Sequence, residues 1–356
     1  MTQDAPLRHA IQQLSMGDSL TAEATAAAFG VIMRGEGTPV LTAALLMGLR
    51  AKGESAEEVA GAAHALRCAM VRLEVADAGA MVDTCGTGGG RVGTINISTA
   101  AAFVVAGAGV SVAKHGNRSY TSRSGSADVI EALRIDIGVP PARAAQVLRH
   151  AGLVFLFAPT YHPAMRHVGP VRKELGVPTI MNLLGPLANP AGVRRQVIGV
   201  ASRERAPLMA EALARLGAIH ALVLHAAVGM DEVSPCGATH VWEVREGDVT
   251  EWEIAPGSLG LECDDLDGLA GGEPAENAER VERLLGGDGK LVDRYAVLLN
   301  AAAALYVSGN GWTMQESVAR ARAALESGAG ARVLARLREA APRDGGAPDG
   351  GARESP

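Results

Sequence analysis

A strand that runs directly into a cluster of glycines is the feature that most constrains how this chain folds. Met81-Val82 has the character of a strand, and glycines occupy four of the five positions 86–90. A helix is predicted over residues 98–108, with Ser98 or Thr99 as its cap. The glycine turn and the unpaired amide groups of this helix start would face one anion-sized space, which favours a phosphate site.

The spacing of these glycines excludes two common nucleotide-binding motifs. Residues 86–90 match neither GxGxxG nor the P-loop sequence GxxxxGK[ST]. Taken alone, a glycine cluster after a strand can be no more than a turn. The segment Asn96-Ile97-Ser98-Thr99, at the start of the predicted helix, is what favours phosphate binding over the plain turn.

The sequence pattern changes near residue 80. Residues 1–75 show apolar spacings of three and four, no strand, and a capping box from Ser55 to Glu58. Later strands are expected at 81–82, 110–113, 153–158, 196–200 and 221–224, and helices at 98–108, 126–133, 142–150 and 205–216. This alternation predicts an α/β protein with a central sheet flanked by helices. The tail, 341–356, is rich in Gly, Pro and Asp and is expected to be disordered.

Charge and cysteine usage narrow the classes of function. The net charge of −6 argues against a general nucleic-acid binder, which would carry a basic excess. The four cysteines stand far apart without a CxxC pair, so we expect reduced thiols rather than a zinc site or a disulfide framework. Neither a signal peptide nor an apolar segment of membrane length is recognisable, so we expect a cytoplasmic protein.

A second polar segment, Lys114 to Ser119, follows the strand expected at 110–113. Two cations there flank a His-Gly-Asn triplet. Loops at the carboxyl ends of strands are where α/β proteins place binding groups. The cationic, amide and hydroxyl groups of this segment suit a pyrophosphate and a ribose, so it is a stronger functional candidate than a plain connection.

Three further polar segments have both a structural and a functional interpretation. Asp231-Glu232 is either a solvated turn or a ligand pair for Mg²⁺, a cation that prefers oxygen ligands. The basic segment 162–175 either presents a solvated face or uses an arginine to bind a carboxylate. The turn-rich segment 182–190 is more consistent with packing than with chemistry.

Taken together, these segments resemble the anthranilate phosphoribosyltransferase family. The resemblance covers about residues 5 to 340, and the combination of motifs in this order is specific. The matching motifs are Gly86-Thr87-Gly88-Gly89, Asn96-Ile97-Ser98-Thr99, Lys114-His115-Gly116-Asn117-Arg118, Ser124-Gly125-Ser126-Ala127-Asp128, His162-Pro163-Ala164-Met165, Asn182 to Pro190, Asp231-Glu232-Val233-Ser234 and Gly271-Gly272-Glu273-Pro274-Ala275-Glu276-Asn277-Ala278.

The resemblance implies an activity, a domain arrangement and partners. The family joins anthranilate to phosphoribosyl pyrophosphate in tryptophan synthesis. A small α-helical domain would comprise residues 1–78 and about 165–185, and a larger α/β domain with a mainly parallel sheet would comprise 79–164 and 186–340. The implied partners are the two substrates, Mg²⁺ at two ions per subunit and a second copy of the chain bound through the helical domain, with no nucleic acid or membrane.

The same resemblance implies roles for individual residues. The implied contacts of phosphoribosyl pyrophosphate are Gly86, Gly89, Gly90, Thr94, Asn96, Ile97, Ser98, Thr99, Lys114, His115, Gly116, Asn117, Arg118, Ser119, Ser122 and Ser126. The implied anthranilate contacts are Gly86, Asn117 and Arg172, with Arg172 facing the carboxylate. Ser98 would bind one Mg²⁺, and Asp231 with Glu232 a second. Lys114 and His115 are the catalytic candidates, and His115 is either a general base or a structural loop histidine.

One position departs from the family pattern. The family usually has Asp after the glycine at 89, whereas this chain has Gly90, so the Mg²⁺ requirement is the property most open to change.

Two other functions are possible interpretations of the sequence. One is that of an enzyme similar to pyrimidine nucleoside phosphorylases, but their lysine-serine-threonine phosphate signature is not found. The other is a non-catalytic relative that binds nucleic acid, against which Asn117, Arg172 and the negative net charge argue.

Overall fold

The structure, a computed structural model, describes residues 3–90, 92–119 and 123–343. Residues 344–356 of the predicted disordered tail lie outside this part of the chain. Residues 341–343, which the sequence also assigned to the tail, are packed on the α/β part instead. Ala341 is 3% exposed and its carbonyl oxygen accepts a hydrogen bond from Asp136 N, while Pro342 forms an isolated bridge with Ile135.

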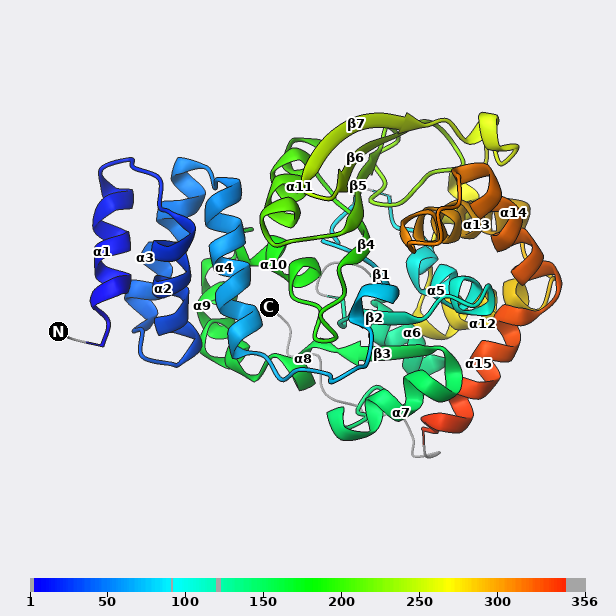
Figure 1. The fold of residues 1–356 in the computed structure, drawn as a ribbon, viewed down its shortest axis with the longest axis horizontal. Coiled ribbons are helices and arrows are strands. Elements are labelled where there is room, and N and C mark those ends of the chain that lie inside the picture. Colours follow the sequence, from blue (N-terminus) through cyan, green and yellow to red (C-terminus); the bar gives the residue numbers. More distant parts are fainter. Residues whose placement is uncertain (1–2, 91, 120–122, 344–356) are drawn as a thin grey trace.

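Residues 5–69 form helices, as the apolar spacing predicts, and these helices pack together as a bundle (Figure 1). Its helices are α1 (Ala5–Ser15), α2 (Ala22–Met33), α3 (Pro39–Lys52) and α4 (Ala56–Ala69). Thr21, Thr38 and Ser55 each cap the next helix by accepting a hydrogen bond from an amide of its first turn, and Ser55 with Glu58 forms the predicted capping box. Apolar faces of these helices share one buried cluster with α9 (Gly169–Leu175) and α10 (Met181–Leu187), which come much later in the chain.

In the described residues, seven strands form one sheet in the order β3-β2-β1-β4-β5-β6-β7. Their bounds are β1 (Val82–Gly86), β2 (Val112–Gly116), β3 (Leu153–Phe157), β4 (Arg195–Gly199), β5 (His220–Ala226), β6 (Thr239–Arg245) and β7 (Asp248–Ile254). The strands from β3 to β5 are parallel, while β5-β6 and β6-β7 pair antiparallel. The carboxyl ends of the parallel strands therefore lie along one edge of the sheet, where ligands bind in such folds.

Helices cover both faces of this sheet (Figure 1). On one face α5 (Ile97–Gly107) packs on α13 (Leu291–Val307) and on α15 (Ala329–Ala340). On the other face α11 (Ala206–Arg215) packs on β5 and β6 and also touches α4, so this helix joins the sheet to the helical bundle. The further helices are α6 (Ser126–Ala132), α7 (Pro141–Ala151), α8 (Ala158–Tyr161), α12 (Pro274–Leu285) and α14 (Met314–Glu326), with short 3₁₀ turns at η1 (Ala78–Ala80), η2 (Pro163–His167), η3 (Arg203–Arg205), η4 (Pro256–Leu259) and η5 (Asp267–Leu269).

This architecture confirms the predicted fold class, a small helical domain beside a larger α/β domain with a mainly parallel sheet, and corrects several details. The hairpin β6–β7 was not predicted, although its sequence alternates and turns at Glu246-Gly247, both with positive φ. The segment 182–190, expected to be a turn-rich loop, is largely the helix α10. Helix α5 begins at Ile97 after Asn96, so neither Ser98 nor Thr99 occupies the cap position.

Candidate functional site

The polar segments singled out in the sequence meet at the carboxyl edge of β1 and β2. The backbone turns after β1 at Gly88 and Gly89, whose φ angles of 67° and 83° favour glycine. A Cβ atom at Gly90 would lie 2.7 Å from Asp231 Oδ1, and one at Gly86 would lie 3.2 Å from Asp231 Oδ2. The glycine turn and the acidic pair, which are far apart in the sequence, are therefore in direct contact.

Lys114 lies beneath the start of α5, with 3% of its surface exposed. Its Nζ atom donates a hydrogen bond to the carbonyl oxygen of Thr84 and lies 3.3 Å from Ser98 Oγ. Burial lowers the pKa of Lys114, whereas the charge of Asp83 raises it, and weaker contributions from Cys85 and Glu232 also raise it. This arrangement places a lysine where the outward-facing amide groups of a helix start attract an anion.

Asp231 and Glu232 follow β5 in a half-buried turn. Desolvation raises the pKa of both carboxyl groups, and desolvation followed by the charge of Asp231 raises the pKa of Glu232 well above its usual range. Glu232 Oε2 is buried without a hydrogen-bond partner among the described residues. Two half-buried carboxylates with an unpaired buried oxygen suit a divalent cation, because a cation would offset the cost of partly desolvating both charges.

The donor set narrows the choice of cation. Among the described residues, no group of three or more His, Cys, Asp or Glu side chains gathers as a metal site. Mg²⁺ is held in many enzymes by one or two carboxylates together with substrate phosphates and water. The residues present therefore fit Mg²⁺ bound together with a phosphorylated ligand better than they fit a closed structural metal site.

His115 is fixed by partners on both sides of its ring. Its Nδ1 lies 3.1 Å from the carbonyl oxygen of Gly185, and its Nε2 lies 3.2 Å from Nε2 of His162. Burial lowers the pKa of His115 to about 3 and that of His162 to about 4. Since a carbonyl oxygen only accepts, His115 carries its proton on Nδ1, and its Nε2 accepts a hydrogen bond from His162. Both ring nitrogens of His115 are therefore occupied, and neither is left to take a proton from a substrate.

Several other predicted residues lie close together around the same loops. Asn96 Nδ2 donates to the carbonyl oxygen of Ser124 at 3.2 Å, and Ser126 Oγ donates to that of Asn117 at 3.3 Å. Arg118 instead forms ion pairs with Asp128 at 2.8 Å and with Glu131 at 2.5 Å, so two carboxylates already balance its charge.

The remaining predicted contacts occupy varied environments. The side chain of Ile97 is fully buried, so only its backbone can contact a ligand, and Thr99 Oγ1 is buried without a hydrogen-bond partner among the described residues. Gly116 lies against Ser126 and Phe155, and Ser119 N donates to Asp128 Oδ2 at 3.4 Å. Thr94 pairs with Ala270 in an isolated bridge. Ser122 lies outside the described residues.

Arg172 belongs to the other part of the molecule. It lies in the last turn of α9, which packs on α3 and shares the apolar cluster of the helical bundle. Asn117 follows β2 in the α/β part. The two residues predicted to bind the same small ligand thus come from different parts of the fold.

Sequence reasoning missed the buried support of this site. Asp83 is fully buried in β1, and its Oδ1 accepts from His115 N at 3.2 Å while its Oδ2 accepts from Asn189 Nδ2 at 2.8 Å. Asn189 also donates to the carbonyl oxygen of Ala113 at 2.8 Å. A carboxylate inside an apolar strand was the available signal, but its partners could not be identified from local sequence.

Comparison with known proteins gives the same picture along most of the chain. Residues 8–70 match the "Glycosyl transferase family, helical bundle domain", and residues 78–331 match the "Glycosyl transferase family, a/b domain". The chain is 48% identical over 331 residues to the anthranilate phosphoribosyltransferase of Rubrobacter xylanophilus, covering 93% of this chain and 96% of that protein. It is 47% identical over 329 residues to the enzyme of the same name from Rhodopseudomonas palustris, covering 92% and 96%.

Solved structures with similar folds carry the same name. The crystal structure of the anthranilate phosphoribosyltransferase from Thermus thermophilus matches with a TM-score of 0.88 and 44% identity, covering 93% of this chain and 98% of that one. The Saccharomyces cerevisiae enzyme in complex with PRPP and Mg matches with a TM-score of 0.85 and 30% identity, covering 95% and 98%. The chain belongs to the anthranilate phosphoribosyltransferase family.

Proposed function

We propose that this chain transfers the phosphoribosyl group of 5-phosphoribosyl 1-pyrophosphate to the amine of anthranilate, releasing pyrophosphate, in tryptophan biosynthesis. The observation that carries the proposal is the contact between the glycine turn and Asp231, with buried Lys114 and the start of α5 beside Ser98. A related enzyme at 30% identity is known in complex with PRPP and Mg, and another structure of that enzyme holds 4-fluoroanthranilate. PRPP and Mg are the kinds of ligand that the anion site and the acidic pair described above would accept.

The chemistry is displacement of pyrophosphate from C1 of the ribose by the amine, with inversion. An oxocarbenium-like transition state needs stabilisation of the departing pyrophosphate and alignment of the amine. We assign these tasks to the amides of Gly86, Gly89 and Gly90, to the start of α5 and to the ammonium group of Lys114. Mg²⁺, when bound, supplies additional positive charge for the leaving group.

We assign His115 a structural role rather than that of general base. Its Nε2 accepts from His162 and its Nδ1 donates to Gly185, so it fixes the end of β2 and the loop that follows. An aromatic amine attacks with its lone pair and loses its proton afterwards, so the reaction does not need a base in the step that forms the new bond.

The acceptor site is proposed to lie between the two parts of the fold. Gly86 and Asn117 would contact anthranilate from the α/β part, and Arg172 would bind its carboxylate from α9. A guanidinium group binds a carboxylate through two parallel hydrogen bonds, which orients the ring as well as attracting its charge. Closer approach of the two parts would then bring the amine to the ribose.

We further propose two Mg²⁺ ions per subunit, one at Ser98 and one at Asp231 with Glu232. Support comes from the raised pKa of both carboxyl groups and from the unpaired oxygen of Glu232. Gly90 stands where the family usually has Asp, against Asp231 Oδ1. Without the carboxylate that the family usually has at position 90, Asp231 and Glu232 would bind a cation more weakly. The reaction would then need a higher Mg²⁺ concentration.

A homodimer through the helical bundle is also proposed. Val40 and Met47, seven residues apart on α3, are 77% and 37% exposed, and Met16 after α1 is 64% exposed. Large apolar side chains clustered on one helix surface are typical of interfaces.

The described residues contain no helix of the length and apolarity that crossing a membrane would need, and the described cysteines are free. We propose a cytoplasmic location, where such thiols remain reduced.

The proposed reaction is tested with purified protein, anthranilate, phosphoribosyl pyrophosphate and a Mg²⁺ series. We expect the fluorescence of anthranilate to decay only when all three components are present. A product that forms without phosphoribosyl pyrophosphate, or phosphorolysis of thymidine at a comparable rate, would contradict the proposal. Decay that needs more Mg²⁺ in the natural protein than in Gly90→Asp would support the role given to position 90.

Lys114→Gln should lower kcat by about 100-fold or more, because an amide cannot replace positive charge beside the leaving group. The amide can still donate to Thr84, so the local hydrogen bond has a substitute. Lys52→Gln is the matched control, since Lys52 is also a mostly buried lysine, paired with Glu58 at 3.0 Å in the helical bundle. Both variants should lose stability in thermal unfolding, but only Lys114→Gln should lose turnover, and unchanged kcat would refute the assignment.

The buried histidine pair makes stability depend on pH. The folded pKa of His162, about 4, lies below its unfolded value of roughly 6.5, so the unfolded chain takes up the proton first as pH falls. Stability is therefore lost as pH drops from about 6.5 toward 4, by about 1 to 3 kcal/mol at pH 5. Denaturant unfolding of His162→Gln should show a smaller loss between pH 7 and 5, and His9→Gln, exposed on α1, should behave as the natural protein. Equal losses in all three would contradict this cause.

Replacing both Val40 and Met47 with Lys should produce monomers in sedimentation velocity, because charges would be buried at the proposed interface. The control is Val249→Lys on β7, at a position that is also 37% exposed but lies on the opposite part of the molecule. A natural protein that sediments as a monomer, or a dimer that survives both lysines, would overturn the proposed interface.

A further inference from the structure

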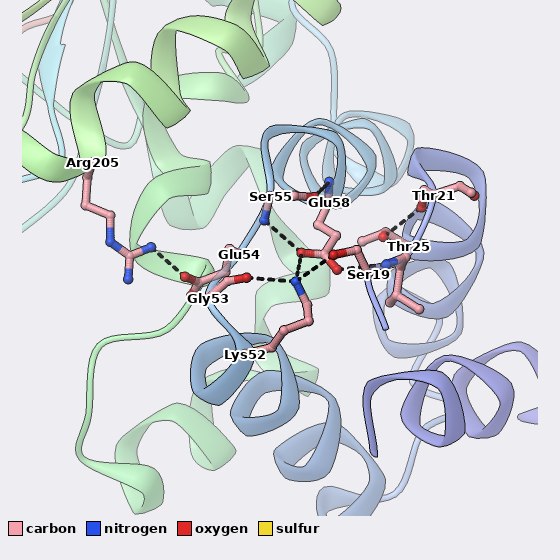
Figure 2. Close-up of polar contacts among 10 residues, drawn as sticks. Ser19, Thr21, Thr25, Lys52, Gly53, Glu54, Ser55, Glu58 and Arg205 are labelled. Atoms are coloured by element: carbon pink, nitrogen blue, oxygen red, sulfur yellow. Dashed lines mark hydrogen bonds and ion pairs between the residues drawn. The ribbon is translucent and has the colours of Figure 1, made fainter. Parts of the chain in front are cut away.

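An ion pair joins the helical bundle to the α/β part close to the candidate site. Arg205 Nη1 lies 2.5 Å from Glu54 Oε2, and the side chains are 26% and 1% exposed (Figure 2). Glu54 lies in the turn between α3 and α4, and Arg205 ends η3 just before α11. The other ion pairs of α1 to α4 among the described residues, Arg8–Asp4, Arg34–Glu36 and Lys52–Glu58, stay within the bundle.

The bundle holds the Glu54 end rigidly. Gly53, just before it, has a φ angle of 89°, and its carbonyl oxygen accepts from Lys52 Nζ at 2.7 Å (Figure 2). Lys52 also contacts Ser19 Oγ at 3.2 Å and Glu58 at 3.0 Å. The fully buried Glu58 accepts from the amides of Ser55 and Leu20 at 2.8 Å and 2.9 Å. The turn that carries Glu54 is thus fixed by charge-assisted hydrogen bonds that join α3, the start of α4 and the loop between α1 and α2.

The Arg205 end continues into the glycine turn. Arg205 N donates to Ser202 O at 3.1 Å, which closes the short segment 200–205 after β4. From that segment Ala201 N donates to Thr87 Oγ1 at 3.3 Å, and Thr87 N donates to the carbonyl oxygen of Gly199 at 2.9 Å. Thr87 lies between Gly86 and Gly88, so the segment after β4 holds the glycine turn through both the backbone and the side chain of one residue.

The same segment supports the acidic pair. At Gly199 a Cβ atom would overlap the carbonyl oxygen of Asp231, so the end of β4 and Asp231 are in backbone contact. His225 Nδ1 also lies 2.8 Å from Val200 O. A shift of residues 199–205 would therefore displace the glycine turn and Asp231 together.

We propose that Glu54 and Arg205 are positioning residues: their ion pair is a strut that fixes residues 199–205 and, through Thr87, holds the glycine turn in the shape that binds the pyrophosphate of the donor substrate. The inference rests on the proposed function, because it gives the glycine turn that ligand. Stability alone is a weak reason for such a pair, since burying two charges usually costs about as much as their attraction returns. A role in fixing the shape of the site explains why the Glu54–Arg205 ion pair lies between the two parts of the fold.

Arg205→Gln and Glu54→Gln should each raise the KM for phosphoribosyl pyrophosphate about 10-fold, with less than a 3-fold change in kcat and in the KM for anthranilate. The double variant should be no worse than either single variant, because residues that act through one contact are not additive. Thr87→Val should also raise the donor KM, and its effect should be non-additive with that of Arg205→Gln. This non-additivity tests whether the effect of Arg205 reaches the glycine turn through Thr87. Arg205→Lys, which keeps the charge, should recover most of the donor affinity.

Arg34→Gln is the control, because it removes an ion pair with Glu36 that stays within the bundle and does not touch the turn that carries Glu54. It should leave the donor KM unchanged. If Arg205→Gln lowers the melting temperature but leaves the donor KM unchanged, or if the two single effects add in the double variant, the ion pair is only a packing contact and the proposal is wrong. If Arg205→Gln does not fold, Arg205→Lys and Glu54→Gln carry the same test.

A binding readout separates this proposal from the proposed reaction. Phosphoribosyl pyrophosphate with Mg²⁺ should raise the melting temperature of the natural protein, and at equal ligand concentration should raise that of Arg205→Gln less. If the donor binds but anthranilate is not consumed, the proposed reaction is wrong. The proposal for the ion pair is then still decided by comparing the donor-induced shift in melting temperature between the natural protein and Arg205→Gln. A natural protein whose melting temperature does not respond to the donor would overturn both.

Discussion

Two buried groups of opposite charge on neighbouring strands, Asp83 and Lys114, are the constraint on which the rest of the site depends. Burial raises the pKa of Asp83 and lowers that of Lys114, and in each case the partner's charge is the largest opposing effect. Burying an unpaired charge costs free energy, and each of these groups lowers that cost for the other. Asp83 also fixes the backbone of His115 and the amide of Asn189, which ties β1, β2 and the segment before β4 together. The ammonium group consequently stands at a fixed place under the start of α5.

The arrangement around this pair explains why the site lies at one edge of the sheet. Parallel pairing of β2, β1, β4 and β5 brings the segments after these strands to a common edge, although the segments after β1 and β5 are separated by more than a hundred residues of sequence. Glycines at 86, 90 and 199 permit backbones and the Asp231 side chain to approach where any Cβ would meet another atom. Fold and site are thus coupled by close backbone contact rather than by long side chains.

The sequence predicted the parts of this arrangement that depend on local pattern. The α/β alternation, the helical character of residues 1–75 and the glycine turn are readable because apolar period, caps and glycines act over a few residues. The partners of Asp83 and His115 were not readable, since Asn189 lies 106 residues from Asp83 and Gly185 lies 70 residues from His115. Arg118 shows the same limit: its motif suggested a phosphate contact, but two acidic side chains of α6 reach it first. The hairpin β6–β7 does have a local signal, in its alternating strands and its turn at Glu246-Gly247.

The place of α9 and α10 in the helical bundle has a consequence for how the chain is made. Their apolar residues, among them Val171, Leu183 and Leu187, belong to the same buried cluster as Leu45 and Leu49 of α3. During synthesis the first four helices leave the ribosome long before residues 169–187 exist, so part of their apolar surface has no cover at that stage. Such surface attracts other chains and chaperones. A truncated product that ends before α9 is therefore expected to aggregate, and the N-terminal bundle matures only after the middle of the chain has been translated.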